Sequence, residues 1–209
     1  MTVRPTTPKG AATRARILDA ATVLFHENGV DATGLEDVLA GSDTGKSQLY
    51  HYFGGKAGLV DDVIDTQADR ILSWHSDLLA GVDDVDCLRR WADAIVAAVE
   101  QRHGAFGCPL GSLAVQVADR SETHRARVTQ GFSRWEGVLE AAVARIVVDP
   151  GLAADRAAVL LTALQGGLLL AEATHETRYL RLGLDAAIAD VERMVSRTPG
   201  RRSRRGSSH

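Results

Sequence analysis

Five polar side chains gather within six consecutive positions near residue 50, and their chemistry suits contact with phosphates and base edges. They are Lys46, Ser47, Gln48, Tyr50 and His51. The apolar residues Leu49 and Phe53, four positions apart, mark the core-facing side of a helix, so the five polar groups lie largely on its other side, which carries no carboxylate. Ammonium, amide, hydroxyl and imidazole groups are typical donors to nucleic acids. The segment predicts a helix that reads DNA.

Three aromatic residues fall within four positions of this helix, and they are expected to differ in role. We assign Phe53 to the core and the Tyr50 hydroxyl to a phosphate contact. For Tyr52 both interpretations stay open.

Two earlier helices are expected to position the polar helix. Apolar residues recur with a helical period up to Phe25, and Gly29 provides a C-terminal stop. The segment Thr33-Gly-Leu-Glu36 matches a capping box, in which Thr33 caps a new helix and Glu36 reaches back to it. This second helix is short and ends near Gly41. Three such helices with a tight turn before the last predict a helix-turn-helix unit.

The distribution of charge restricts where a duplex could bind. The chain carries a net charge of −3, with zero on residues 1–60, −8 on residues 61–196 and +5 on residues 197–209. An acidic body repels DNA, so only the N-terminal unit or the basic tail is expected to approach it. The low-complexity tail is expected to be disordered and either to add sequence-independent affinity for DNA or to be inert.

The sequence argues against an enzyme, a metal site or a membrane protein. It contains no nucleophile elbow, phosphate-binding glycine loop or HExxH motif, and we expect no cofactor. Cys87 and Cys108 have no metal-ligand spacing and are expected to be reduced thiols. No apolar signal segment opens the chain, and the longest apolar stretch, 157–171, is short for a membrane span. We predict a soluble, cytoplasmic protein that makes no membrane contact.

The N-terminal quarter resembles the DNA-binding domain of the TetR family of transcriptional regulators. The resemblance covers residues 13–64 and rests on the segments ILDAATVLF, NGVDAT and LYHYF, the last followed by Lys56. It implies a dimeric regulator with a divergent C-terminal ligand domain. Carried over position by position, it implies DNA contacts from Thr33, Lys46, Ser47, Gln48, Tyr50, His51 and Lys56.

Two positions depart from the usual family pattern. Asp43 stands where the family often has glycine, and Gly45 stands where it often has a serine or threonine cap. Either Thr44 takes over as the cap, or Gly45 serves as a weaker one. The start of the recognition helix depends on which alternative holds.

A second resemblance lies downstream, in the segment Gly107-Cys-Pro-Leu-Gly-Ser-Leu-Ala114. It is similar to a Cys-Pro-x-Gly segment of the LmrA-like subset of the family, and Gly54-Gly55-Lys56 fits the same subset. The resemblance implies an effector that is planar or hydrophobic.

The remainder of the chain predicts a C-terminal helical domain that binds a ligand and dimerises. A long amphipathic helix from about residue 56 to 79 would link it to the DNA unit, and further helices are expected near 84–103, 111–118, 122–148, 153–173 and 183–196. The helix around 157–171 is apolar on most sides, which predicts burial against a partner subunit as well as its own domain. With the last helix it would form a two-fold four-helix interface. The residues predicted at this interface are Leu161, Leu164, Leu168, Ile188, Val191 and Val195. The alternative is that both helices only complete the monomer core.

Large side chains in the middle helices are candidates for the walls of a ligand pocket. Polar groups among them would contact the ligand, whereas the alternative for each residue is ordinary core packing. The candidates are Trp74, His75, Leu78, Trp91, Cys108, Phe132, Trp135 and Gln165.

The sequence as a whole predicts an all-α chain with an arm (1–10), a tri-helical DNA-binding domain (11–55), a helical ligand-binding and dimerisation domain (56–196) and a tail (197–209). The expected function is that of a dimeric repressor that binds a palindromic operator in double-stranded DNA and is released by a small hydrophobic effector. A second hypothesis is a helical ligand- or partner-binding dimer whose DNA unit is weak or lost. A third is an activator or a ligand-independent global regulator.

Overall fold

The computed structural model describes residues 5–105, 107–147 and 149–197, and these residues form helices joined by short turns, with no strand among them. The prediction of an all-α chain is confirmed. The helices are α1 (Pro8–Asn28), α2 (Leu35–Ser42), α3 (Lys46–Phe53), α4 (Lys56–Leu78), α5 (Val85–Glu100), α6 (Pro109–Val117), α7 (Glu122–Val143), α8 (Pro150–Thr174) and α9 (Arg178–Arg197).

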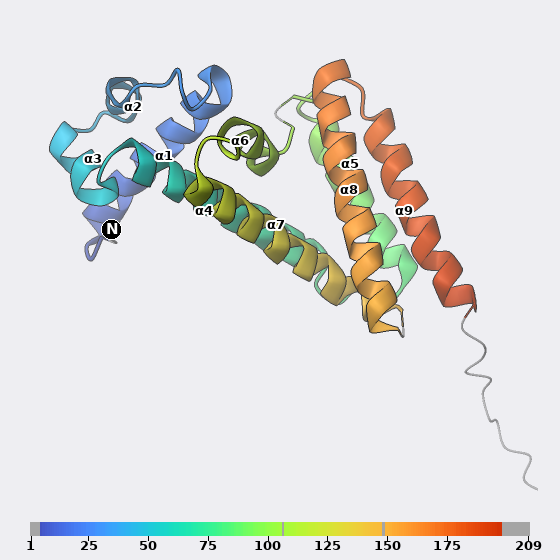
Figure 1. Cartoon of the computed structure of the whole chain (residues 1–209). Helices are drawn as coiled ribbons and strands as arrows, with labels where there is room; N and C mark the ends of the chain where they lie inside the picture. The colour runs from blue at the N-terminus through green and yellow to red at the C-terminus, as the bar shows by residue number, and fades with distance from the viewer. Residues whose placement is uncertain (1–4, 106, 148, 198–209) are drawn as a thin grey trace, which may run out of the picture.

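Helices α1 to α3 form one end of the molecule, and α5, α8 and α9 lie toward the other (Figure 1). Helices α4 and α7 run side by side between the two ends, and α6 lies near α1. This arrangement makes α4 and α7 the connection through which a change at one end can reach the other.

The first helix begins earlier than the sequence predicts. Thr7 caps α1 by accepting a hydrogen bond from the Gly10 amide at 3.1 Å, and Pro8 takes the first helical position, where its missing N–H costs nothing. Residues 8–10 of the predicted arm therefore belong to α1. The predicted tail, apart from Arg197, lies outside the described residues.

The predicted cap of the second helix is wrong. Gly34 is the N-cap of α2, and its amide donates to Asp37 Oδ2 at 2.7 Å, so Asp37 rather than Glu36 reaches back. The Thr33 hydroxyl turns inward and donates to the carbonyl oxygens of Leu24 and Gly29 at 3.1 and 2.8 Å. Thr33 thus satisfies the free carbonyls at the end of α1.

The third helix has the predicted bounds, and the structure explains its unusual start. Gly45 is the N-cap, and its amide donates to Gln48 Oε1 at 3.1 Å. Asp43 ends α2 in the left-handed conformation, with φ of 49°. Glycine meets that requirement without a steric penalty, whereas aspartate is one of the few other residues that tolerate it.

Ion pairs attach the N-terminal unit to α4. Arg14 of α1 contacts Asp62 of α4 at 2.5 Å, and its guanidinium also lies over the Phe53 ring, 5.2 Å from the centroid. Arg70 of α4 pairs with Asp19 of α1 at 2.6 Å. Helices α1 and α3 and the start of α4 are therefore held together by these contacts.

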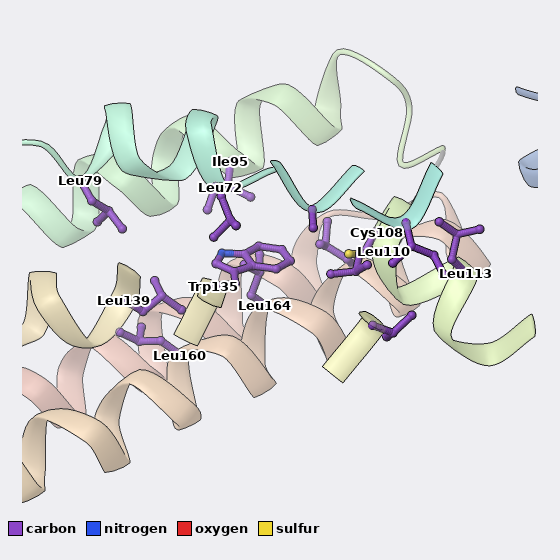
Figure 2. Close-up of a cluster of buried hydrophobic side chains, with 14 of the residues drawn as sticks. Leu72, Leu79, Ile95, Cys108, Leu110, Leu113, Trp135, Leu139, Leu160 and Leu164 are labelled. Atoms are coloured by element: carbon purple, nitrogen blue, oxygen red, sulfur yellow. The ribbon is translucent and has the colours of Figure 1, made fainter. Parts of the chain in front are cut away.

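The core of the C-terminal domain lies between α4, α5, α7, α8 and α9. Trp91, Trp135, Leu139, Leu160 and Leu164 are among the largest fully buried side chains. Figure 2 shows four of them close together: Trp135, Leu139, Leu160 and Leu164. This packing fixes the far end of α4 against the rest of the domain.

Helix α8 is apolar enough to be compared with a membrane span. It has 25 residues, and 33% of its most apolar window, with a mean hydropathy of 1.5, is buried. The core helix of a soluble protein has the same character. In this chain α8 packs against α7 on one side and α9 on another, so its apolar surface is divided among neighbours.

Candidate nucleic-acid interface and ligand cavity

The exposed side of α3 carries the polar residues that the sequence places there. Lys46, Ser47, Gln48, Tyr50 and His51 are all exposed, and 47% of the Tyr50 surface is accessible. The opposite side anchors the helix, because Leu49, Tyr52 and Phe53 are buried. Tyr52 is therefore a packing residue, which resolves the alternative that the sequence leaves open.

A carboxylate that the sequence analysis missed lies beside this surface. Glu36 of α2 contacts the Lys46 ammonium group at 3.2 Å, and both side chains are largely exposed. The hydrogen bond from Lys46 to Glu36 raises the pKa of the lysine. Glu36 takes one of the three donors of this ammonium group and would compete with a phosphate for it. The spacing of residues within α3 could not predict this contact, because Glu36 lies ten positions before Lys46 in the sequence.

Two other residues predicted to contact DNA, Thr33 and Lys56, lie outside α3. Thr33 is 1% exposed and its hydroxyl is used within the N-terminal unit, so we leave it out of the interface. Lys56, at the start of α4, donates to the Asp31 carbonyl oxygen at 3.1 Å. Its ammonium group thereby stays near the α1–α2 turn while remaining partly accessible.

A cavity of about 370 Å³ opens where α4, α5, α7 and α8 meet the segment before α6. Four of the predicted ligand residues line it: Trp74, His75, Cys108 and Trp135. Several further lining residues were not predicted from the sequence, namely Gln67, Arg70, Ile71, Ile95, Arg102 and Leu168. Polar residues on amphipathic helices are ordinarily assigned to solvent, which is why Arg70 and Arg102 gave no signal.

The other predicted ligand residues do not line this cavity. Trp91 is 1% exposed, while Leu78 and Phe132 pack against the hydrophobic core. Gln165 lines a neighbouring hollow of about 480 Å³ between α6 and α8, which also includes Cys108. The Gln165 Nε2 atom is buried and has no hydrogen-bond partner among the described residues.

His75 is a neutral group at the wall of the cavity. The Trp91 indole N–H donates to His75 Nδ1 at 3.0 Å, and the ring lies 4.6 Å from that of Trp135, centroid to centroid. Burial lowers the pKa of His75 to about 4, because desolvation penalises the charged form. The imidazole therefore adds no positive charge to the cavity at neutral pH.

Each cysteine lies at the start of a helix. Cys108 caps α6, and its Sγ accepts from the Gly111 amide at 3.3 Å, while burial raises the pKa of its thiol. A thiol with a raised pKa is a weak nucleophile. Cys87 lies near Asp83 and Asp84 in an exposed group with metal-ligating atoms, but Asp84 serves as the N-cap of α5 by accepting from the Cys87 amide at 2.8 Å.

Most of the residues predicted at the dimer interface lie inside the subunit. Leu164, Leu168, Ile188 and Val191 are each at most 8% exposed, so they complete the monomer core and cannot face a partner. Leu161 is partly buried and packs against this core, and Val195 is 40% exposed. For these four residues the predicted interface is wrong, because each lies on the side of α8 or α9 that packs within the subunit.

A different apolar stripe on α8 is exposed. Val159, Ala163, Gly166 and Leu170 recur at spacings of four, three and four residues, which places them on one side of the helix, and all four are at least partly accessible. Leu182 of α9, 59% exposed, adds to the apolar surface of this helix pair. The stripe is apolar surface of α8 that remains exposed in the single subunit.

The two adjacent glycines of α8 have different surroundings. A Cβ at Gly167 would lie 2.6 Å from Leu180 Cα, so this glycine lets α9 approach α8 within one subunit. A Cβ at Gly166 would have no atom within 4 Å. The close approach of two helices at Gly167 is thus made within the chain, and Gly166 takes no part in it.

Helix α6 joins the cavity to the N-terminal unit of α1 to α3. Cys108, at its start, lines the cavity, and Gln116, near its end, accepts from the Val30 amide at 2.7 Å and donates to the Phe25 carbonyl oxygen at 3.4 Å. Just beyond α6, Arg120 pairs with Asp31. Both contacts reach the turn between α1 and α2, so a shift of α6 would act directly on the N-terminal unit.

Two family models match the chain. Residues 17–63 match a model described as bacterial regulatory proteins of the tetR family, and residues 85–184 match one described as the C-terminal domain of LmrA/YxaF-like transcriptional regulators. These two regions contain, respectively, the α3 surface and much of the cavity wall.

Individual proteins agree with these matches. The transcriptional regulator LmrA of Bacillus subtilis is 27% identical over 85% of this chain and 95% of its own length. The transcriptional repressor KstR2 of Rhodococcus jostii is 28% identical over 62% of this chain and 65% of its own length. Among solved structures, a TetR transcriptional regulator from Chloroflexus aurantiacus superimposes with a TM-score of 0.76 and 23% identity, covering 90% of this chain and 98% of that one.

Proposed function

Since the chain belongs to the TetR family of bacterial transcriptional regulators and is not an enzyme, we propose that it represses transcription by binding a palindromic operator as a homodimer until a small hydrophobic effector releases it. The single observation that supports this proposal best is the exposed polar side of α3, held outward by three buried residues. In this account Lys46, Tyr50, His51 and Lys56 contact phosphates, and Ser47 and Gln48 face base edges.

The apolar stripe on α8, together with Leu182 of α9, is the proposed dimer interface. A two-fold axis through paired α8 and α9 helices would create an isologous four-helix contact. In this arrangement each subunit presents one α3, and the two recognition helices must lie roughly 34–36 Å apart to enter successive major grooves. Burial of the stripe in the dimer would also explain why so apolar a helix is only partly covered within one subunit.

The cavity between α4, α5, α7 and α8 is the proposed effector site. A ligand against Trp74 and Trp135 would displace α4 or the start of α6, and α6 carries that movement to Val30 through Gln116. The spacing of the two recognition helices would change as a result. Coupling of this kind is typically about 1–3 kcal/mol, which is several-fold to about a hundredfold in operator affinity.

The experiment that tests the function is a selection of bound sequences from a random duplex DNA pool, without effector and at moderate salt. An enriched inverted repeat is expected, since a two-fold dimer reads the same half-site twice. Failure of well-folded protein to enrich any sequence would contradict the proposal.

A binding dimer with weak or lost DNA affinity remains the second candidate function, favoured by the Lys46–Glu36 ion pair and by the net charge of −8 on residues 61–196. The salt dependence of DNA binding separates the two. A regulator that neutralises several phosphates loses affinity steeply as salt rises, whereas a lost interface shows little binding at any salt concentration.

A further inference from the structure

The lining of the cavity has a charge that the surrounding domain does not share. Arg70 and Arg102 both line it, and no aspartate or glutamate is among its lining residues. Residues 61–196 as a whole carry a net charge of −8. Two arginines without a carboxylate are therefore a local exception within an acidic domain.

From this lining we propose that the effector is an amphipathic organic anion, with its apolar body between Trp74, Trp135 and Leu164 and its negative group bound by Arg102. This inference rests on the proposed effector site and names the class of ligand that the site takes. A guanidinium group presents a planar fork of donors that matches a carboxylate or phosphate.

Arg102 is the arginine available for this contact. It follows α5, its side chain is exposed, and it makes no ion pair with any residue in the described part of the chain. Arg70 differs, since it is already paired with Asp19 at 2.6 Å. Arg102 also lines the hollow beside α1 together with Glu27, with which it makes no ion pair. On the other side, the Glu172 carboxylate lies next to Gly107 and lines the hollow between α6 and α8. An incoming anion would thus meet one free guanidinium and a second that is shared.

The rest of the lining suits an apolar and aromatic body. Ile71, Ile95, Val99, Leu164 and Leu168 provide aliphatic surface, and two indole rings lie beside them. His75 remains neutral because of its burial, so it does not compete with the arginines for the anion. An apolar lining with a few convergent polar groups is the usual composition of a small-molecule site.

The test uses matched probes on the full chain in the absence of DNA. Isothermal titration calorimetry compares 2-naphthoate, which carries a carboxylate, with the neutral 2-naphthamide and the cationic 2-naphthylmethylammonium. We expect the carboxylate to bind about tenfold more tightly than the amide, as a hydrogen bond to a charged partner provides, and the cation to bind most weakly.

Two variants test whether Arg102 causes the preference for the carboxylate over the amide. Arg102→Gln is expected to abolish the difference between carboxylate and amide while leaving amide affinity unchanged. Arg90→Gln on the exposed side of α5 serves as the matched control and is expected to preserve the difference. Thermal denaturation of both variants shows whether Arg102 acts instead as a cation at the C-terminal end of α5, where it would stabilise the helix.

Several outcomes would overturn the inference. Equal affinities for naphthoate and naphthamide would show a site for neutral ligands, and retention of the preference in Arg102→Gln would show that another group binds the anion. Failure of all three probes to bind would also contradict it. None of these results concerns DNA, so the operator selection can succeed or fail independently.

Discussion

Helices α3 and α8 use their residues in opposite ways. Helix α3 has two sides of different chemistry, with Leu49, Tyr52 and Phe53 buried and its polar groups exposed. Helix α8 is apolar nearly all round, and its surface is divided among the subunit core, the hollow beside α6 and an open stripe. The buried side of an amphipathic helix such as α3 can be predicted from its sequence. The buried side of a uniformly apolar helix such as α8 depends on which neighbours pack against it.

The largest effect, on dimerisation and operator affinity, is expected from a substitution in the exposed stripe of α8. Leu170→Asp places a charge in the proposed dimer contact, so we expect monomers by size-exclusion chromatography with light scattering, and operator affinity reduced by more than about a hundredfold because two half-sites no longer bind together. Leu169→Asp is the control, since Leu169, although 65% exposed, lies in the hollow beside α6, which the stripe meets only at Gly166. An intact dimer in Leu170→Asp would refute the assignment of the stripe.

The next largest effect is the pH dependence of stability that arises from the buried imidazole of His75 in the C-terminal domain. His75 has a pKa of about 4 when folded, against 6.5 for an unperturbed histidine, so the unfolded chain binds the extra proton between these limits. The free energy of unfolding should therefore be unaffected by this group above about pH 6.5 and fall by about 3 kcal/mol as the pH drops to 4.

Denaturant titrations across this pH range measure the effect. His75→Asn keeps an acceptor for the Trp91 indole but removes the titrating ring, so its unfolding free energy should lose this component of the pH dependence. An identical pH dependence in wild type and variant would show that His75 is not held neutral by the fold.

A smaller change in unfolding free energy is expected when a buried glycine of α8 is compared with an exposed glycine of α7. Gly167→Ala forces a Cβ against Leu180 Cα, so we expect a loss of about 2 kcal/mol in unfolding free energy. Gly137→Ala in α7 meets no atom within 4 Å and is expected to stabilise the helix by about 0.5–1 kcal/mol. Chemical denaturation followed by circular dichroism compares them, and changes of the same sign would contradict this description of the packing.

The smallest effect compares the two sides of α3. Tyr50→Phe removes an exposed hydroxyl and should weaken binding to specific and unrelated duplexes alike by about 1 kcal/mol, roughly fivefold, if that hydroxyl bonds a phosphate. Tyr52→Phe removes a hydroxyl from the buried side and should leave affinity unchanged. Fluorescence anisotropy with both duplexes decides, and unaltered affinity in Tyr50→Phe would remove its assigned role.

The sequence was sufficient where amphipathic periodicity was strong. The bounds of α3, its exposed residues and the all-helical architecture follow from the spacing of residues such as Leu49 and Phe53. It was insufficient where position depends on contacts distant in the sequence. Thr33 looks like a cap but satisfies the end of α1, and Leu164 and Leu168 look like a partner surface but complete their own core. Arg102 lines the cavity only because, in the folded chain, the end of α5 surrounds the same space as residues of α4 and α8.

The most direct test of the DNA-reading role of α3 is a duplex selection carried out in parallel with the wild type and with Gln48→Ala. Gln48 accepts from the Gly45 amide through Oε1, which leaves its Nε2 donors free for a base edge. We predict an inverted repeat for the wild type, and the same repeat with one base position relaxed in each half-site for the variant. An unchanged motif in Gln48→Ala, or no motif for the wild type, would contradict the account.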